Sequence, residues 1–206
     1  MHKIRIVSRL GERQERTKGN AMLIHTTVLG IDLVLETAPG LFSPKAVDRG
    51  TLAMLACAEF HPGDRILDLG CGYGVVGIFA ARKAGEDGIV MLDSDTEAVE
   101  IAARNASRNG VPLVRTIHSD GFASLEETGF DWILSNPPYH TDFSVARRFI
   151  EKGFNRLCIG GRMLMVTKRR DWYRNKFIAV FGGVRIVEND GYFIFLGEKR
   201  KGDYSR

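Results

Sequence analysis

The feature that most restricts the possible folds of this chain is a glycine-rich segment between two apolar runs. Ile66 and Leu67 lead into Asp68-Leu69-Gly70-Cys71-Gly72-Tyr73-Gly74, and an apolar, alanine-rich stretch follows at 75–81. Glycine permits a positive φ and lets a ligand approach the backbone closely. A strand, a glycine turn and a helix in this order form a unit whose helix N-terminus can hold a cofactor. The spacing is not the dinucleotide pattern G-x-G-x-x-G, because the third glycine falls at position 74 and not at 75.

Strand-like and helix-like segments alternate along most of the chain. Short apolar runs predict strands near 65–69, 89–93, 114–118, 131–135, 162–167, 184–188 and 192–197. Longer segments predict helices near 45–60, 75–84, 95–109, 142–158 and 171–181. This alternation indicates an α/β fold, a doubly wound, mostly parallel sheet of seven strands with helices on both faces. The last two strands are joined only by 188–191, which suits a hairpin.

The first 40 residues have a different pattern. Runs typical of strands occur at 4–7, 22–28 and 31–35, and the polar stretch 11–20 predicts a loop between them. We therefore expect an N-terminal antiparallel hairpin or small β extension over residues 1–40, followed by a main domain over 41–206.

Two prolines follow the predicted strand 131–135 directly. The sequence there is Asn136-Pro137-Pro138-Tyr139, and neither proline can continue the hydrogen-bond ladder of a central strand, because proline lacks an N–H. The strand must end, which leaves a stiff turn with carbonyl acceptors, an amide side chain and a phenol. These groups suit a planar amine, since carbonyls accept its hydrogens and the ring stacks on the attached base. The alternative is a turn that only ends the strand.

An acidic residue ends the second strand of the predicted sheet. Asp93 follows the apolar run 89–92 and lies 23 positions after Gly70. An acid about 20 positions beyond such a loop can accept hydrogen bonds from both ribose hydroxyls of a nucleoside. The alternative is a solvated carboxylate at the end of a strand.

Together these segments resemble the motifs of class I S-adenosylmethionine-dependent methyltransferases. The resemblance rests on 68–74, on Asp93 and on Asn136-Pro137-Pro138-Tyr139, a form typical of enzymes that methylate a planar amino nitrogen. The segment 40–51, with Gly-Leu-Phe-Ser-Pro at its start and Asp-Arg-Gly-Thr at its end, is similar to the "methyltransferase small" group, which includes ribosomal RNA guanine-N2 methyltransferases. The resemblance covers roughly 30–197 and implies a Rossmann-like sheet with an antiparallel last strand.

The resemblance implies a role for each residue around the cofactor. S-adenosyl-L-methionine carries its own activated methyl group, so the protein mainly has to position it. The glycine loop would take the amino acid part with Asp68 near its ammonium group, Asp93 would bind the ribose, and Asp120 would accept from the adenine amine. Phe122 is a candidate to pack on that ring, with a place in the core as the equal alternative. Lys45 and Asp48 are candidates to close over the cofactor. The expected cofactor-binding residues are Asp68, Gly70, Gly72, Gly74, Asp93, Asp120 and Asn136.

The resemblance also implies how the target amine is held. The side-chain oxygen of Asn136 and the carbonyl of Pro137 would accept its hydrogen bonds, and Tyr139 would stack on the base. Asn136, Pro137 and Tyr139 are therefore the expected catalytic residues. Phe42 is a second stacking candidate, with core packing as its alternative. No strong general base is required, since the amine can release its proton after methylation.

Basic residues are concentrated in particular segments, although the net charge is only +4. Between 142 and 176 there are ten Lys or Arg and three acids, and between 1 and 20 there are six Lys or Arg and two Glu. Such segments near the expected active site favour a polyanion, hence RNA, although solvated helix faces give the same pattern. The expected substrate-binding residues are Phe42, Pro138, Tyr139, Arg148, Lys168 and Arg169.

Length and composition are those expected of one compact enzyme. The chain has 206 residues, 44% of them hydrophobic, and no apolar run of 18 or more. Its first residues do not resemble a signal peptide, so we expect a cytoplasmic protein that does not contact membranes. Cys57, Cys71 and Cys158 lack metal-ligand spacing, so reduced thiols and no metal site are expected. The sequence leaves a monomer and a homodimer open.

Three functions remain open at this level. The first is methyl transfer to the 2-amino group of a guanine in RNA, with ribosomal RNA or a ribosomal subunit as the substrate. The second keeps the enzyme but changes the acceptor to an adenine amino group in RNA or DNA, or to a protein glutamine, since each is a planar NH2. The third is a non-catalytic RNA-binding factor, against which the intact Asp93 and Asn136 count.

Overall fold

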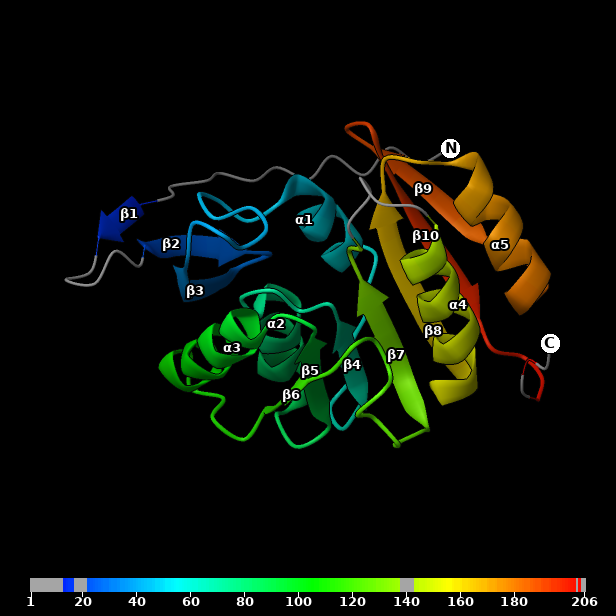
Figure 1. Ribbon diagram of the computed structural model, residues 1–206, viewed down its shortest axis with the longest axis horizontal. Coiled ribbons are helices and arrows are strands. Elements are labelled where there is room, and N and C mark those ends of the chain that lie inside the picture. The colour runs from blue at the N-terminus through cyan, green and yellow to red at the C-terminus, as the bar shows by residue number, and fades with distance from the viewer. Residues whose placement is uncertain (1–12, 17–21, 138–142, 203, 205–206) are drawn as a thin grey trace.

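The computed structural model describes residues 13–16, 22–137, 143–202 and 204, and its centre is a seven-stranded sheet (Figure 1). The strands are β4 (Ile66–Leu69), β5 (Ile89–Asp93), β6 (Arg115–His118), β7 (Phe130–Ser135), β8 (Leu157–Thr167), β9 (Arg185–Asn189) and β10 (Tyr192–Glu198). Their spatial order is β6-β5-β4-β7-β8-β10-β9. Neighbours from β6 to β8 are parallel, whereas β10 is antiparallel to β8 and β9. The predicted mostly parallel sheet with an antiparallel last strand is confirmed.

Helices cover both faces of this sheet. They are α1 (Arg49–Leu55), α2 (Val75–Ala84), α3 (Thr96–Arg108), α4 (Ser144–Arg156) and α5 (Asp171–Phe181). Figure 1 shows α2 and α3 beside β4 to β6, and α4 and α5 beside β8 to β10. No helix among the described residues has the length and apolar character needed to cross a membrane.

The alternation of side chains along each strand divides the interior into two apolar cores. In β4, Ile66 packs with residues of α1, α2 and α3, whereas Leu67 and Leu69 pack with residues of α4 and α5. Successive side chains of a strand point to opposite faces, so a sheet covered on both sides needs apolar residues at nearly every position. This requirement explains the unbroken apolar runs in the sequence of β4 and β5.

Two helix boundaries differ from those predicted. The helix expected at 45–60 is limited to α1, because the side chain of Asp48 accepts a hydrogen bond from the Thr51 amide and caps its start. The helix expected at 142–158 ends at Arg156, and β8 begins at Leu157 instead of near 162, since the backbone of Gly160 and Gly161 bonds to Lys199 just beyond β10. A helix cap overrides the local periodicity at α1, and a contact with a distant segment overrides it at β8.

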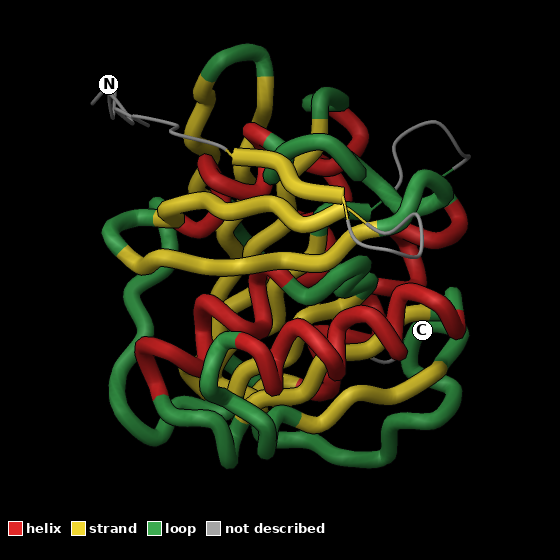
Figure 2. The backbone as a smooth tube through the Cα atoms, turned by 90° about the vertical axis from the view of Figure 1, so that its left-hand side faces the viewer, coloured by secondary structure: helices red, strands yellow, loops and turns green. Residues whose placement is uncertain are grey.

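A second, smaller sheet precedes the main one and contains β1 (Arg13–Arg16), β2 (Met22–Val28) and β3 (Ile31–Thr37). Its strands are antiparallel in the order β1-β2-β3, and Figure 2 shows them side by side above the helices. The prediction of a loop over 11–20 was therefore wrong for residues 13–16, which pair with β2. The run 4–7 lies outside the described residues, and the division of the chain at residue 40 stays a prediction.

Two asparagines, Asn105 in α3 and Asn109 at its C-cap, attach the small sheet to the main domain. Asn105 accepts a hydrogen bond from the Glu36 amide at 2.7 Å and donates to the carbonyls of Glu36 and Tyr73 at 2.8 Å each. Asn109 accepts from the Val34 amide and donates to the Val34 carbonyl, both at 2.9 Å. One turn of helix thus places two side-chain amides along the free edge of β3, where they satisfy backbone groups that another strand would otherwise pair.

Replacing Asn105 with alanine is expected to lower the free energy of unfolding by about 2–3 kcal/mol, because the buried Glu36 and Tyr73 groups lose their partners. Asn105 is 0% exposed, so water cannot replace it without rearrangement. Urea denaturation followed by circular dichroism measures the loss, with Ser107→Ala on the exposed face of α3 as the control. A loss for Asn105→Ala no greater than that of the control would contradict this role.

Candidate active site

A cavity of about 340 Å³ opens at the carboxyl ends of β4, β5, β6 and β7. The strand order reverses between β4 and β7, because the chain builds β5 and β6 on one side of β4 and then returns to the other. The ladder between these strands ends at the pair Asp68 and Leu134, and the Ser135 hydroxyl then donates to the Leu69 carbonyl at 2.7 Å. Reversals of this kind in open α/β sheets form ligand-binding crevices.

The glycine loop forms one wall of the cavity. Gly70 and Gly72 have φ values of +77° and +53°, and an added Cβ at either would meet nothing within 4 Å. The space that a side chain would occupy at these two glycines is therefore empty, and both residues line the cavity. Gly74 does not line it: this residue begins α2, and a Cβ there would lie 3.2 Å from Ile78 and Met91. Close packing of α2, rather than direct cofactor contact, explains the third glycine.

Asp68 lies at the floor of the cavity. The residue is 2% exposed, and its Oδ2 accepts a hydrogen bond from the Gly77 amide at 2.9 Å. Burial raises the pKa of this carboxyl to about 7, a rise that the Gly77 hydrogen bond opposes and the charge of Asp93 assists. A cation in the cavity would favour the ionised carboxylate, so the position suits the ammonium group of an amino acid.

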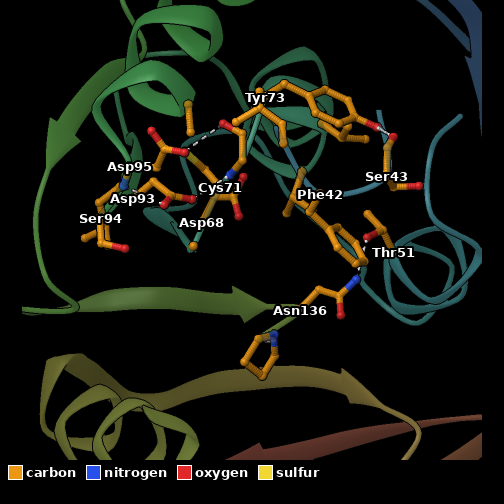
Figure 3. A pocket seen from close by; sticks show the side chains of 18 of the residues that line it. Phe42, Ser43, Thr51, Asp68, Cys71, Tyr73, Asp93, Ser94, Asp95 and Asn136 are labelled. Atoms are coloured by element: carbon orange, nitrogen blue, oxygen red, sulfur yellow. Dashed lines mark hydrogen bonds between the residues drawn. The ribbon is translucent and has the colours of Figure 1, made fainter. Parts of the chain in front are cut away.

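Asp93 organises the loop from the end of β5. Its Oδ2 accepts from the Gly72 amide at 2.8 Å and its Oδ1 from the Asp95 amide at 3.0 Å. A carboxylate can accept about four hydrogen bonds, so capacity remains for a pair of hydroxyls. In Figure 3 the side chains of Asp68, Asp93 and Asp95 lie at one end of the cavity and Asn136 at the other.

Asn136 follows β7 and is held through its amide nitrogen. Nδ2 donates to Asp48 Oδ2 and to Thr51 Oγ1, each at 3.0 Å. The amide oxygen Oδ1 is buried and has no hydrogen-bond partner among the described residues. An unpaired buried acceptor costs free energy that a ligand donor could recover. Pro137, which follows, also lines the cavity.

The far wall contains Asp120 and residues of α4. Arg148 does not line the cavity, but it forms an exposed ion pair with Asp120, which does, with Nη1 3.2 Å from Oδ2. Of the two roles open to Phe122, ring packing and core packing, the structure shows the second. This residue is 5% exposed and lies in the core, edge-on to Phe149, which lines the cavity in its place.

The remaining predicted substrate residues lie in three places. Phe42 lines the cavity and is 49% exposed, as a stacking surface requires. Lys168 and Arg169 do not line it. They follow β8, beside the end of β7, where Lys168 lies over the Tyr192 ring and Arg169 over the Phe143 ring at 4.9 Å. Pro138 and Tyr139 fall outside the described residues.

Several lining residues had no recognisable signal in the sequence. Phe149 and Val145 have the spacing of core residues on an amphipathic helix, and Thr51 was noted only as part of a motif. Tyr73 is buried, and its hydroxyl donates to the carbonyls of Ser43 and Ala46 at 3.3 Å each, which ties the glycine loop to the upstream segment. Only the folded chain brings these segments together.

The residues of the cavity fit S-adenosylmethionine. A buried carboxylate lies beside a glycine loop, a second carboxylate ends the next strand, and a third follows β6, in an order that matches ammonium, ribose and adenine groups. Among the described residues, no three His, Cys, Asp or Glu are grouped so as to hold a metal ion.

The doubly wound sheet, its single antiparallel strand and a cavity at its switch point define the class, a Rossmann-like methyltransferase. The model of the methyltransferase small domain family matches residues 32–196. The chain therefore belongs to the methyltransferase small domain family. The family, the fold and the cofactor class expected from the sequence motifs are confirmed.

Individual relatives agree with this assignment. The chain is 35% identical to ribosomal RNA small subunit methyltransferase C of Hahella chejuensis over 169 residues, which are 79% of this chain and 48% of that protein. It is 30% identical to the uncharacterised protein YbxB of Bacillus subtilis, over 82% of this chain and 87% of the relative. The structure of the Thermus thermophilus 16S rRNA N2 methyltransferase RsmC in complex with AdoMet and guanosine superposes with a TM-score of 0.80 at 25% identity, over 92% of this chain and 58% of that one. The chain thus spans about half the length of the ribosomal RNA methyltransferases that it matches.

Proposed function

We propose that this protein transfers a methyl group from S-adenosylmethionine to the exocyclic 2-amino group of a guanine in RNA, with ribosomal RNA or a ribosomal subunit as its substrate. The observation that carries the proposal is the Asn136 amide, whose nitrogen is anchored and whose buried oxygen lacks a partner among the described residues, at the edge of the cavity. The RsmC structure, whose title names N2 methylation and guanosine, supports guanine as the acceptor.

The residues of the chain bind and orient two reactants. Asp68 would hold the ammonium group, Asp93 the ribose hydroxyls and Asp120 the adenine amine of the cofactor, which supplies an activated methyl on its sulfonium. Asn136 Oδ1 and the Pro137 carbonyl would accept the two hydrogens of the target amine and so direct its lone pair. Holding the reacting atoms in line lowers the barrier without an added catalyst.

The chemistry is a direct displacement. Asn136 Oδ1 and the Pro137 carbonyl would hold the target nitrogen in line with the activated methyl group that the bound cofactor would supply, with the thioether as the leaving group that keeps the electron pair. The nitrogen then releases one proton to solvent. As the nitrogen gives up electron density its N–H groups become stronger donors, so acceptors placed on them stabilise the transition state more than the ground state.

Basic groups near the end of the sheet supply the RNA surface. Lys168 and Arg169 follow β8 directly beside β7, and Arg148 is paired with Asp120, which lines the cavity. Together with the exposed Phe42 ring they offer phosphate contacts and a stacking surface next to Asn136. We place the reaction in the cytoplasm.

Isotopically labelled S-adenosylmethionine with undermodified total RNA and ribosomal subunits tests the proposal. Digestion of the RNA to nucleosides, followed by mass spectrometry, is expected to give labelled N2-methylguanosine. Labelled N6-methyladenosine would overturn the guanine assignment, and no label in RNA despite cofactor binding would overturn RNA as the substrate. Comparison of free RNA with subunits shows which of the two is methylated.

A further inference from the structure

A hydrogen-bond network from outside the glycine loop and the strand-end carboxylates holds the Asn136 amide, and its members Asp48 and Thr51 line the same cavity. An amide nitrogen has two hydrogens, and both are used here, one by Asp48 Oδ2 and one by Thr51 Oγ1. Asp48 and Thr51 belong to the segment that starts α1, and they are 88 and 85 positions from Asn136 in the sequence. This segment therefore fixes a group of the reaction site from outside β7.

Asp48 is itself fixed on both carboxylate oxygens. Oδ2 also accepts from the Thr51 amide at 3.0 Å, and Oδ1 accepts from the Tyr192 hydroxyl of β10 at 3.1 Å. The Tyr192 ring packs against Gly50, where an added Cβ would lie only 2.6 Å from the ring. Glycine at this position lets the phenol approach the carboxylate. The first helix, the strand-end turn and the last strand thus meet at one side chain.

A carboxylate at this position selects the orientation of the neighbouring amide. If the Asn136 amide were reversed, its oxygen would face Asp48 Oδ2 at the distance now occupied by a hydrogen bond, with two acceptors in contact. Thr51 cannot make this selection, since a hydroxyl both donates and accepts. A reversed amide would also present NH2 hydrogens in place of the acceptor oxygen, and an incoming amine needs an acceptor.

We propose that Asp48 is a positioning residue for methyl transfer: through its hydrogen bond with Asn136 Nδ2, it keeps the amide oxygen available as an acceptor for the target amine. Its negative charge also polarises the amide, which strengthens Oδ1 as an acceptor. Tyr192 and Thr51 complete the network by fixing Asp48 and the second amide hydrogen. The inference rests on the proposed function, because it assigns Asp48 a part in binding the same amine.

Asp48→Ser separates positioning from folding. A serine can still cap α1, as the aspartate does through the Thr51 amide, but it no longer offers a carboxylate to Asn136 Nδ2. We expect the turnover number for the methylated acceptor to fall about 10- to 100-fold, as for other small misplacements of a reacting group. Cofactor affinity should stay near that of Asp87→Ser, an exposed control in the loop before β5, and the variant should remain folded although it loses the hydrogen bond from Tyr192. Asp48→Asn should restore much of the lost rate, since an amide oxygen still accepts from Asn136 and still caps α1.

A double-mutant cycle shows whether Asp48 acts through Asn136. In an Asn136→Ala background, Asp48→Ser should cause little further loss, because the group that it positions is already absent. Thr51→Val and Thr51→Ser form a matched pair, of which only the first removes the acceptor for Nδ2. Losses that multiply in the double variant would overturn the proposal.

An NMR measurement decides the role of Asp48 without reference to any acceptor. The side-chain amide of Asn136 is assigned in a 15N–1H correlation spectrum by its absence in Asn136→Ala. We expect its two protons to be protected from exchange in the wild type and to lose that protection in Asp48→Ser. Unchanged protection would overturn the network. If the wild-type protein labels no RNA, the proposed function fails, and this measurement still tests the positioning by Asp48.

Discussion

Replacement of Asn136 with alanine is expected to reduce methyl transfer on the order of 10²- to 10³-fold, the usual loss when one group that stabilises a developing charge is removed. The variant loses the side-chain acceptor for the target amine and leaves only the backbone carbonyl of Pro137. Asp48 and Thr51 lose their shared donor as well, but both retain the hydrogen bond that caps α1. Single-turnover assays with labelled S-adenosylmethionine measure the rate on the acceptor identified in RNA.

Cofactor affinity should change by less than about threefold in the same variant, because Asn136 contacts the amine in the transition state more than it contacts the cofactor. Isothermal titration with the cofactor measures this affinity, and Asn175→Ala on the exposed face of α5 is the control. Equal losses of rate and of cofactor affinity would contradict this division of roles. They would instead show that Asn136 mainly builds the cofactor site.

The affinity for S-adenosylmethionine is expected to rise about tenfold between pH 6 and pH 8, since a carboxyl with a pKa near 7 is mostly protonated at the first pH and mostly ionised at the second. The group is Asp68, whose pKa burial raises from 3.8 to about 7 in the free protein. Only the ionised form offers full attraction to the ammonium group of the cofactor. Titrations across this pH range measure how the affinity depends on pH. Asp68→Asn should bind the cofactor weakly, and its affinity should not change with pH.

The same residue makes the stability of the free protein depend on pH. Between pH 4 and pH 7 the folded state keeps a proton on Asp68 that the unfolded state has released, so stability falls as the pH rises through this range. The shift from 3.8 to about 7 corresponds to a loss of about 4 kcal/mol when complete. Asp68→Asn keeps an acceptor for the Gly77 amide but cannot ionise. Its free energy of unfolding, measured with urea at several pH values, should therefore exceed that of the wild type by more at pH 8 than at pH 5.

If stability depended on pH in the same way in the wild type and in Asp68→Asn, Asp68 would not be protonated in the folded protein. A pH-independent cofactor affinity in the wild type would mean that Asp68 is ionised before the cofactor binds. Stability and affinity test the same pKa by separate routes, because only the second involves the ligand.

Most of the main sheet could be predicted because its signals are local. Strands buried on both faces require unbroken apolar runs, and the helices α2 and α5 begin and end at the residues predicted for them. The turn between β9 and β10 has φ values of +51° at Asp190 and +77° at Gly191, which a tight hairpin requires and the sequence signals. The error at the end of α4 arose because the distant Lys199 pairs with the start of β8, whereas the error at β1 arose because a polar segment pairs with the neighbouring strand β2 without an apolar pattern.

The residues that the strand ends present to the cavity were also predictable. Gly70, Gly72, Asp93 and Asp120 line the cavity, since residues directly after parallel strands meet at the same edge of a sheet. Gly74 was predicted to bind the cofactor but does not line the cavity. The sequence alone cannot distinguish a glycine that packing requires from one that ligand contact requires. The sequence also did not distinguish Phe122, which lies in the core, from Phe149, which reaches the cavity, because the spacing of both is that of core residues.

The sequence by itself therefore determined which segments form the sheet, where its strands end and which groups those ends present, because backbone limits on proline and glycine and the apolar periodicity act between near neighbours. Only the tertiary structure decided which side chains hold those groups. Tyr192 lies 144 positions from Asp48, and Asp48 lies 88 from Asn136, yet their hydrogen bonds leave the buried oxygen of one amide as an acceptor for a ligand. No local rule relates residues at such separations; their geometry depends on the packing of α1 against β8 and β10, which the whole chain must fold to create.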